Sequence, residues 1–135
     1  MAPTLDPGKE AGATIGATLG RARPTLLRRL ASLALIDRRH VTVALATADG
    51  RVVGIDPAAR LGIVRAVART VCDAFCDNVA EGDIILTNDP FSGGTHIQDL
   101  ALLRPLFVAE QLAGWALVQT PLPDLGGMAL GGYYP

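Results

Sequence analysis

The chain has 135 residues and a net charge of −1, and this length fits one domain with a single modest core. A near-neutral charge without a basic block excludes a typical nucleic-acid surface, and no apolar run approaches the roughly 20 residues that a membrane helix needs. Hydrophobic residues are 50% and charged residues 19% of the chain, against about 25% charged in ordinary proteins, and this excess favours burial against a partner chain over a domain that is merely rich in Ala and Leu.

The N-terminal part of the chain predicts an arm, a helix and a hairpin. Residues 1–22 are rich in Gly, Ala, Thr and Pro without a clear period, which indicates a flexible arm ahead of a single domain over 23–135. Leucines repeat at helical spacing over 24–35, where the initial proline can begin a helix because its missing N–H would be unpaired there. Asp49-Gly50 lies between two runs rich in Val and predicts a tight hairpin turn.

The rest of the chain predicts a long helix, a strand and a second hairpin. Apolar residues cluster on one helical face over about 60–79, and a short strand over 83–87 leads into an Asn-Asp-Pro loop. Two apolar runs, 100–108 and 112–120, indicate the second hairpin. We therefore expect an α+β fold with a mostly antiparallel sheet of two hairpins and one strand, packed by one long and one shorter helix.

The loop after the strand over 83–87 carries the most information. Asp-Pro breaks the strand and a Gly-Gly pair allows close backbone approach, so we expect the loop geometry to depend on four residues: Asn88, Asp89, Gly93 and Gly94. The segment lacks the lysine of a phosphate-binding loop, and a plain tight turn is the simpler interpretation of its glycines.

His96 and Asp99 close this loop and are three residues apart. Both side-chain types bind metals, but a stable divalent site needs at least three protein ligands. The alternative is that these side chains hold the loop through hydrogen bonds to the backbone. The spacing alone favours this alternative over metal binding. Further candidate ligands in loops and at strand ends are Asp37, His40, Asp89 and Asp124.

Cys72 and Cys76 are one helical turn apart on the predicted long helix. We interpret them as residues at the margin of the core rather than as half of a zinc site, and the helical spacing does not favour a disulfide between them. Two cysteines without a secretory signal predict a cytoplasmic protein with reduced thiols.

The run from Gly82 to Asp99 resembles the hydantoinase B family, whose pattern is Gly-Asp, an apolar strand, Asn-Asp-Pro, an aromatic residue, Gly-Gly-Thr-His and an Asp. Weaker similarity flanks this run, at the acidic-Arg-Arg segment 37–39 and at the Asp-Leu-Gly-Gly segment 124–127. The resemblance covers roughly residues 30–135. Family members are several times longer, so the chain is similar to their N-terminal region only and is a split-off subunit, a truncated paralogue or a fragment.

The resemblance implies a small subunit of a multi-subunit, ATP-dependent ligase, most similar to a ketone carboxylase such as acetophenone carboxylase, which uses bicarbonate. It implies a hetero-oligomer with hydantoinase A-like and other hydantoinase B-like subunits, Mg-ATP on the A-type partner, and no activity of this chain alone. The alternatives are a non-catalytic structural subunit with a vestigial metal loop, a subunit of an ATP-dependent hydantoinase or oxoprolinase, and an independent small binding domain.

For the metal, the resemblance implies zinc or manganese held by His96, Asp99 and Asp37. The family usually has a further histidine shortly before the Asp-x-Gly-Gly segment, and Leu122 stands there in this chain. A group from another chain could complete the ligand shell, and otherwise the site is vestigial. We therefore expect a weakened or remodelled metal site, and the sequence assigns no catalytic residue.

Overall fold

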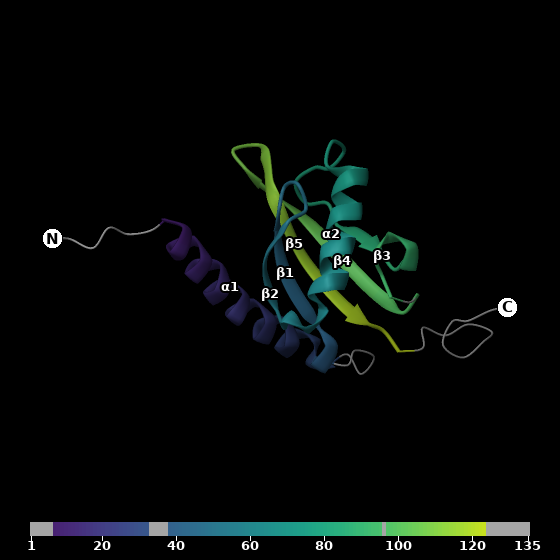
Figure 1. Cartoon of the computed structure of the whole chain (residues 1–135). Helices are drawn as coiled ribbons and strands as arrows, with labels where there is room; N and C mark the ends of the chain where they lie inside the picture. Colours follow the sequence, from purple (N-terminus) through teal and green to yellow (C-terminus); the bar gives the residue numbers. More distant parts are fainter. Residues whose placement is uncertain (1–6, 33–37, 96, 124–135) are drawn as a thin grey trace.

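The computed structural model of the protein describes residues 7–32, 38–95 and 97–123. These residues form a five-stranded antiparallel sheet with the strand order β2-β1-β5-β4-β3 and two α-helices (Figure 1). The expected α+β class is confirmed. Neither of the described helices combines the length and the apolar character of a membrane span.

The two predicted hairpins form the larger part of the sheet. The strands are β1 (Thr42–Thr47), β2 (Val52–Asp56), β3 (Ile85–Thr87), β4 (Asp99–Val108) and β5 (Gln111–Pro121). The hairpins β1–β2 and β4–β5 join through pairing of β1 with β5, and β3 pairs with β4 at one edge. The helices are α1 (Pro7–Arg29) and α2 (Leu61–Phe75), with short 3-10 turns η1 (Leu30–Ser32), η2 (Arg38–His40), η3 (Ala58–Arg60) and η4 (Pro90–Ser92).

The N-terminal helix differs from its prediction. Residues 7–22 lie in α1, where we expected an arm without regular structure, and Pro24 lies inside the helix instead of beginning it. Glycine and threonine have low helix propensity. An apolar contact with β2 nevertheless stabilises this segment as a helix, and a local sequence pattern cannot reveal that contact. The end predicted at 35 lies outside the described residues, and the division into an arm over 1–22 and a domain over 23–135 stays a prediction.

The hydrophobic core lies between α2 and one face of the sheet. The helix contributes Val64, Val67, Ala68, Val71 and Cys72, and the strands contribute Ala44, Ala46, Ala101, Leu103, Trp115 and Leu117. Because side chains alternate along a strand, these strand residues share one face. The Trp115 indole is fully buried and its Nε1 donates to the carbonyl of Ala48 at 3.3 Å. The helix ends at Phe75, before the predicted end near 79, in a turn where the N–H of Asn78 donates to the Phe75 carbonyl.

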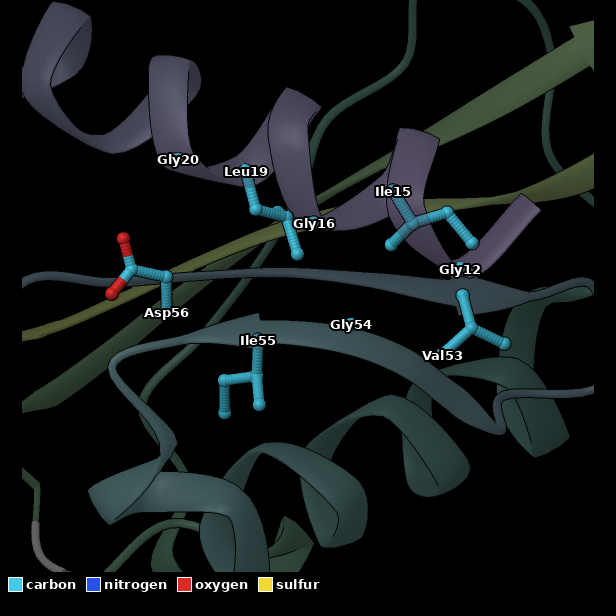
Figure 2. Close-up of a pocket in the computed structure, with 9 residues that line it drawn as sticks. All are labelled: Gly12, Ile15, Gly16, Leu19, Gly20, Val53, Gly54, Ile55 and Asp56. Atoms are coloured by element: carbon cyan, nitrogen blue, oxygen red, sulfur yellow. The ribbon is translucent and has the colours of Figure 1, made fainter. Parts of the chain in front are cut away.

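Helix α1 packs on the opposite face of the sheet, at the β2 edge. Figure 2 shows one helix on each side of β2. A Cβ atom at Gly54 would lie 2.5 Å from Cγ2 of Ile15 and 2.6 Å from Cδ1 of Leu19, so the absence of a side chain permits this close packing. The Arg23 Nε also donates to the carbonyl of Val41 at 2.9 Å. The α1 helix is therefore docked on the first hairpin.

Candidate functional site

Asp89 organises the loop between β3 and β4. Its Oδ1 accepts a hydrogen bond from the Phe91 N–H at 2.9 Å, and its Oδ2 accepts one from the Ser92 hydroxyl at 2.6 Å. Its carbonyl accepts from the N–H groups of Ser92 at 3.1 Å and Gly94 at 3.4 Å. The Ser92 hydroxyl, followed by the Phe91 N–H, lowers the pKa of the Asp89 carboxyl below its ordinary value. A charged carboxylate thus caps η4 and holds the loop closed.

Gly93 places this loop directly against α2. Its φ angle is 98°, and a Cβ atom there would lie 2.6 Å from the backbone N of Val67 and 2.8 Å from Cβ of Ala66. A positive φ and contact with a helix backbone both require the absence of a side chain. At Gly94 a Cβ atom would lie 3.1 Å from the carbonyl oxygen of Asp89, a closer approach than most side chains tolerate. The loop is therefore packed on the helix as well as hydrogen-bonded within itself.

Asp99 is the buried carboxylate at the end of the loop. Its side chain is 0% exposed, and its Oδ1 accepts from Nη1 of Arg60 at 3.0 Å. Its Oδ2 accepts from the Thr95 N–H at 3.3 Å and from the Thr95 hydroxyl. At the start of the same loop, Nδ2 of Asn88 donates to the carbonyl of Ile97 at 2.9 Å. Both ends of the loop are thus tied down, and a guanidinium group balances the charge of Asp99.

Two further polar side chains lie on the same sheet face as Asp99. Gln119 is the register partner of Thr42 on β1 and of Ala101 on β4, and Asp99 is its diagonal neighbour on β4. The hydroxyl of Thr42 and both amide atoms of Gln119 are buried without a hydrogen-bond partner in the described part of the chain. We call Arg60, Asp99, Gln119 and Thr42 the polar corner.

Sequence reasoning missed three of the four residues of the polar corner. Arg60 lies 39 residues before Asp99, and no local pattern connects the two positions. Thr42 and Gln119 fall within runs that the sequence analysis interpreted only as strands. A polar residue on the buried side of an alternating strand was the one available signal, since burial of such a residue is unusual.

Of the three predicted metal ligands, the structure places one. Asp99 lies in the polar corner, whereas His96 and Asp37 lie outside the described residues, as does the further candidate Asp124. Leu122, at the position of the family's further histidine, is half-buried. Within the described ranges no group of three or more His, Cys, Asp or Glu residues could hold a metal ion. The ligand set therefore stays a prediction.

The two cysteines occupy different environments. Cys72 is buried in the core and Cys76 is exposed, and both thiols are free. Burial, with smaller contributions from Cys76, Asp73 and Asp49, raises the pKa of the Cys72 thiol to about 11. Cys72 is therefore an inert core residue.

A groove of about 350 Å³ lies between α1 and β2 (Figure 2). Its walls are mainly glycine and apolar side chains, with Asp56 as the single ionisable residue. Such a lining offers close packing but no converging polar groups, so the chemistry of this chain is better sought at the polar corner.

Apolar side chains are exposed around the β3 edge. The exposed fractions are 63% for Ile84, 61% for Leu86 and 98% for Phe91, and we call these three residues the β3 surface. Three exposed acidic residues, Glu81, Asp83 and Asp89, flank these side chains along the chain. Exposed apolar groups next to charged residues are typical of a surface that binds another polypeptide.

Comparison with known proteins identifies one family. The family model for hydantoinase B/oxoprolinase matches residues 15–135. The chain is 37% identical over 82 residues to caprolactamase subunit beta of Pseudomonas jessenii, covering 61% of this chain and 14% of that protein. It is 29% identical over 113 residues to the 5-oxoprolinase PfmaA of Pestalotiopsis fici, covering 82% and 9%. It is 26% identical over 92 residues to the acetophenone carboxylase delta subunit of Aromatoleum aromaticum, covering 67% and 14%.

The fold is shared with a solved member of this group. The crystal structure of the ATP-dependent caprolactamase from Pseudomonas jessenii matches with a TM-score of 0.76 and 27% identity, over 98% of this chain and 24% of that one. The chain therefore spans about a quarter or less of the length of these relatives.

Proposed function

The chain belongs to the hydantoinase B/oxoprolinase family, and we propose that it works as a small subunit of a multi-subunit, ATP-dependent enzyme of the hydantoinase type. The observation that carries this proposal is the family match over residues 15–135. Two of these relatives are themselves described as subunits. Partners in the proposed complex are hydantoinase A-like and other hydantoinase B-like chains, with Mg-ATP bound on the A-like partner.

The finer proposal is a carboxylase of the acetophenone or acetone type, which joins a ketone and bicarbonate at the expense of ATP. Similarity to the acetophenone carboxylase delta subunit supports it. The higher identity to caprolactamase subunit beta favours a second candidate, an ATP-dependent enzyme that opens a cyclic amide. The two candidates differ in substrate but require the same kind of complex.

Within such a complex, the β3 surface is the proposed contact with a partner subunit. A fully exposed phenylalanine in a loop fixed by Asp89 is presented without further ordering cost, and preorganised aromatic residues are common anchors of interfaces. A partner with an apolar pocket next to basic residues would complement Phe91 and the exposed Asp83 and Asp89. The role proposed for the polar corner is to fix the loop that presents Phe91, since Asp99 connects Thr95 to Arg60.

The test begins with the tagged chain purified from its native host. We expect hydantoinase A-like and B-like chains to co-purify in fixed ratio, as identified by mass spectrometry. The complex should hydrolyse ATP and turn over either acetophenone or acetone with bicarbonate, or a lactam such as caprolactam or 5-oxoproline. The isolated chain should do neither. Turnover by the isolated chain, or a monomer without these partners in the host, would overturn the proposal.

Matched surface variants test the contact. Phe91→Ser should reduce recovery of the partner chains more than tenfold, because it removes the exposed aromatic anchor. Val53→Ser changes an apolar residue that is 47% exposed on β2, at the opposite edge of the sheet, and should leave recovery unchanged. Both variants should retain the circular dichroism spectrum of the native chain. Equal recovery with the two variants would exclude Phe91 as the anchor.

A further inference from the structure

The polar corner does not fit a divalent cation at Asp99. Both carboxylate oxygens already accept hydrogen bonds, one from the Arg60 guanidinium and the other from Thr95. A metal ion at Oδ1 would face the Arg60 guanidinium, and two positive groups on one oxygen repel each other. A metal ion at Oδ2 would have to displace the two donors of Thr95 that hold the loop, and it would still lie close to the same guanidinium. We propose that Arg60 takes the place of a divalent cation at Asp99, so that an internal ion pair occupies the position at which the family resemblance implies a metal ion.

The position of Arg60 makes this pairing a fixed feature of the fold. Arg60 ends η3 and directly precedes α2, where the N–H of Leu61 donates to the carbonyl of Ala58. Its side chain is only 20% exposed, so the guanidinium is held over the sheet face that α2 covers. Asp99 is at the start of β4, in register with Pro121 on β5. Two packed elements therefore bring the opposite charges together, and little water competes for them.

The charges of the polar corner agree with a guanidinium in place of a metal ion. A guanidinium supplies a carboxylate with both positive charge and directional N–H donors, whereas a metal cation supplies positive charge without such donors. Gln119, the diagonal neighbour of Asp99 on the same sheet face, is neutral, so it adds no second charge to the pair of Arg60 and Asp99. Leu122 adds no ligand. This inference does not rest on the proposed enzymatic function, because it concerns only the isolated chain.

The experiment measures metal binding by the full chain without partners or ATP. Mn²⁺ binding is followed by the loss of the free-ion electron paramagnetic resonance signal, and Zn²⁺ binding by calorimetry. The wild-type chain should show no binding that depends on Asp99, as judged against Asp99→Asn. Arg60→Met should bind Mn²⁺ or Zn²⁺ at least tenfold more tightly than wild type, and Arg60→Met/Asp99→Asn should lose that gain.

Folding of each variant is checked through Trp115, the single tryptophan, whose burial makes its emission a report on the core. Arg60→Gln keeps an N–H donor for Asp99 and replaces Arg60→Met if that variant does not fold. Leu122→His in the wild-type background separates the two explanations for a weakened site. A gain with Leu122→His and none with either Arg60 variant would attribute the loss of metal to the missing histidine and overturn the proposal.

Stoichiometric, Asp99-dependent metal in the wild-type chain would overturn the proposal directly, whatever the variants do. The same conclusion follows if a natively folded Arg60 variant binds no more tightly than wild type. These outcomes are independent of subunit assembly: a chain that assembles into an ATP-dependent complex can pass or fail the metal measurement, and so can one that does not.

Discussion

The ion pair between Arg60 and Asp99 should dominate the stability of the polar corner. At their separation of 3.0 Å and an effective dielectric constant near 20, two unit charges interact by about 5.5 kcal/mol, from which the cost of desolvation is subtracted. Removing one partner of a buried pair costs about 3–5 kcal/mol because the remaining charge is left uncompensated. Since Asp99 is 0% exposed and Arg60 20%, Arg60→Met should cost more than Asp99→Asn.

A double-mutant cycle measures this coupling. We expect a loss of about 4 kcal/mol for Arg60→Met, about 2 for Asp99→Asn and about 3 for both together, which gives a coupling of roughly 3 kcal/mol. Urea denaturation followed by Trp115 fluorescence gives each free energy of unfolding, with an unchanged slope as the check for two-state behaviour. A coupling below about 0.5 kcal/mol would show that the charges do not interact in the folded chain. A greater loss for Asp99→Asn than for Arg60→Met would refute the argument from burial.

Three further predictions concern single positions. In urea denaturation, Gly93→Ala should lose at least about 2 kcal/mol more stability than Gly82→Ala. Both glycines have a positive φ, but only at Gly93 would a Cβ atom meet the α2 backbone, at 2.6 Å. Equal losses would contradict this steric reason. Thr42→Val should raise the free energy of unfolding by about 1 kcal/mol, because the buried hydroxyl is unpartnered within the described residues, and a clear loss would show that it is paired in solution. Iodoacetamide at pH 8 should alkylate Cys76 and not Cys72. With a pKa of about 11, about one Cys72 side chain in a thousand is a thiolate at that pH. Equal modification of the two cysteines in mass spectra of the native chain would contradict this prediction.

The parts of the fold that the sequence predicts are the parts encoded locally. The first hairpin depends on Asp49-Gly50, and Gly50 has the positive φ of 79° that its turn requires. The N–H of Gly50 donates to the carbonyl of Thr47, which closes the turn within four residues. The α1 helix is the counterexample, because Leu19 is buried against the β2 strand more than 30 positions later in the chain. Contacts of that range leave no periodic trace in a segment rich in glycine.

The candidate site also has a part that is encoded locally and a part that is not. The loop from Asn88 to Asp99 was predictable because its turn residues and its two aspartates lie within twelve successive positions. Hydrogen bonds to Asp89 from nearby residues hold it. The partner of Asp99 could not be predicted, because Arg60 lies at the start of a segment interpreted only as a helix. The pairing arises when α2 packs on the sheet, which is a property of the folded chain and not of either segment.

The two oxygens of Asp99 separate its two possible roles. Oδ2 accepts from Thr95 and thereby holds the loop, a role that persists whatever cation lies at the other oxygen. Oδ1 faces Arg60, so the residue at position 60 decides whether the corner is closed by a guanidinium or open to another positive group. Because that choice is made at the start of α2, outside the loop, a substitution at position 60 changes the charge that faces Oδ1, while the donors of Thr95 still reach Oδ2 in a chain that folds.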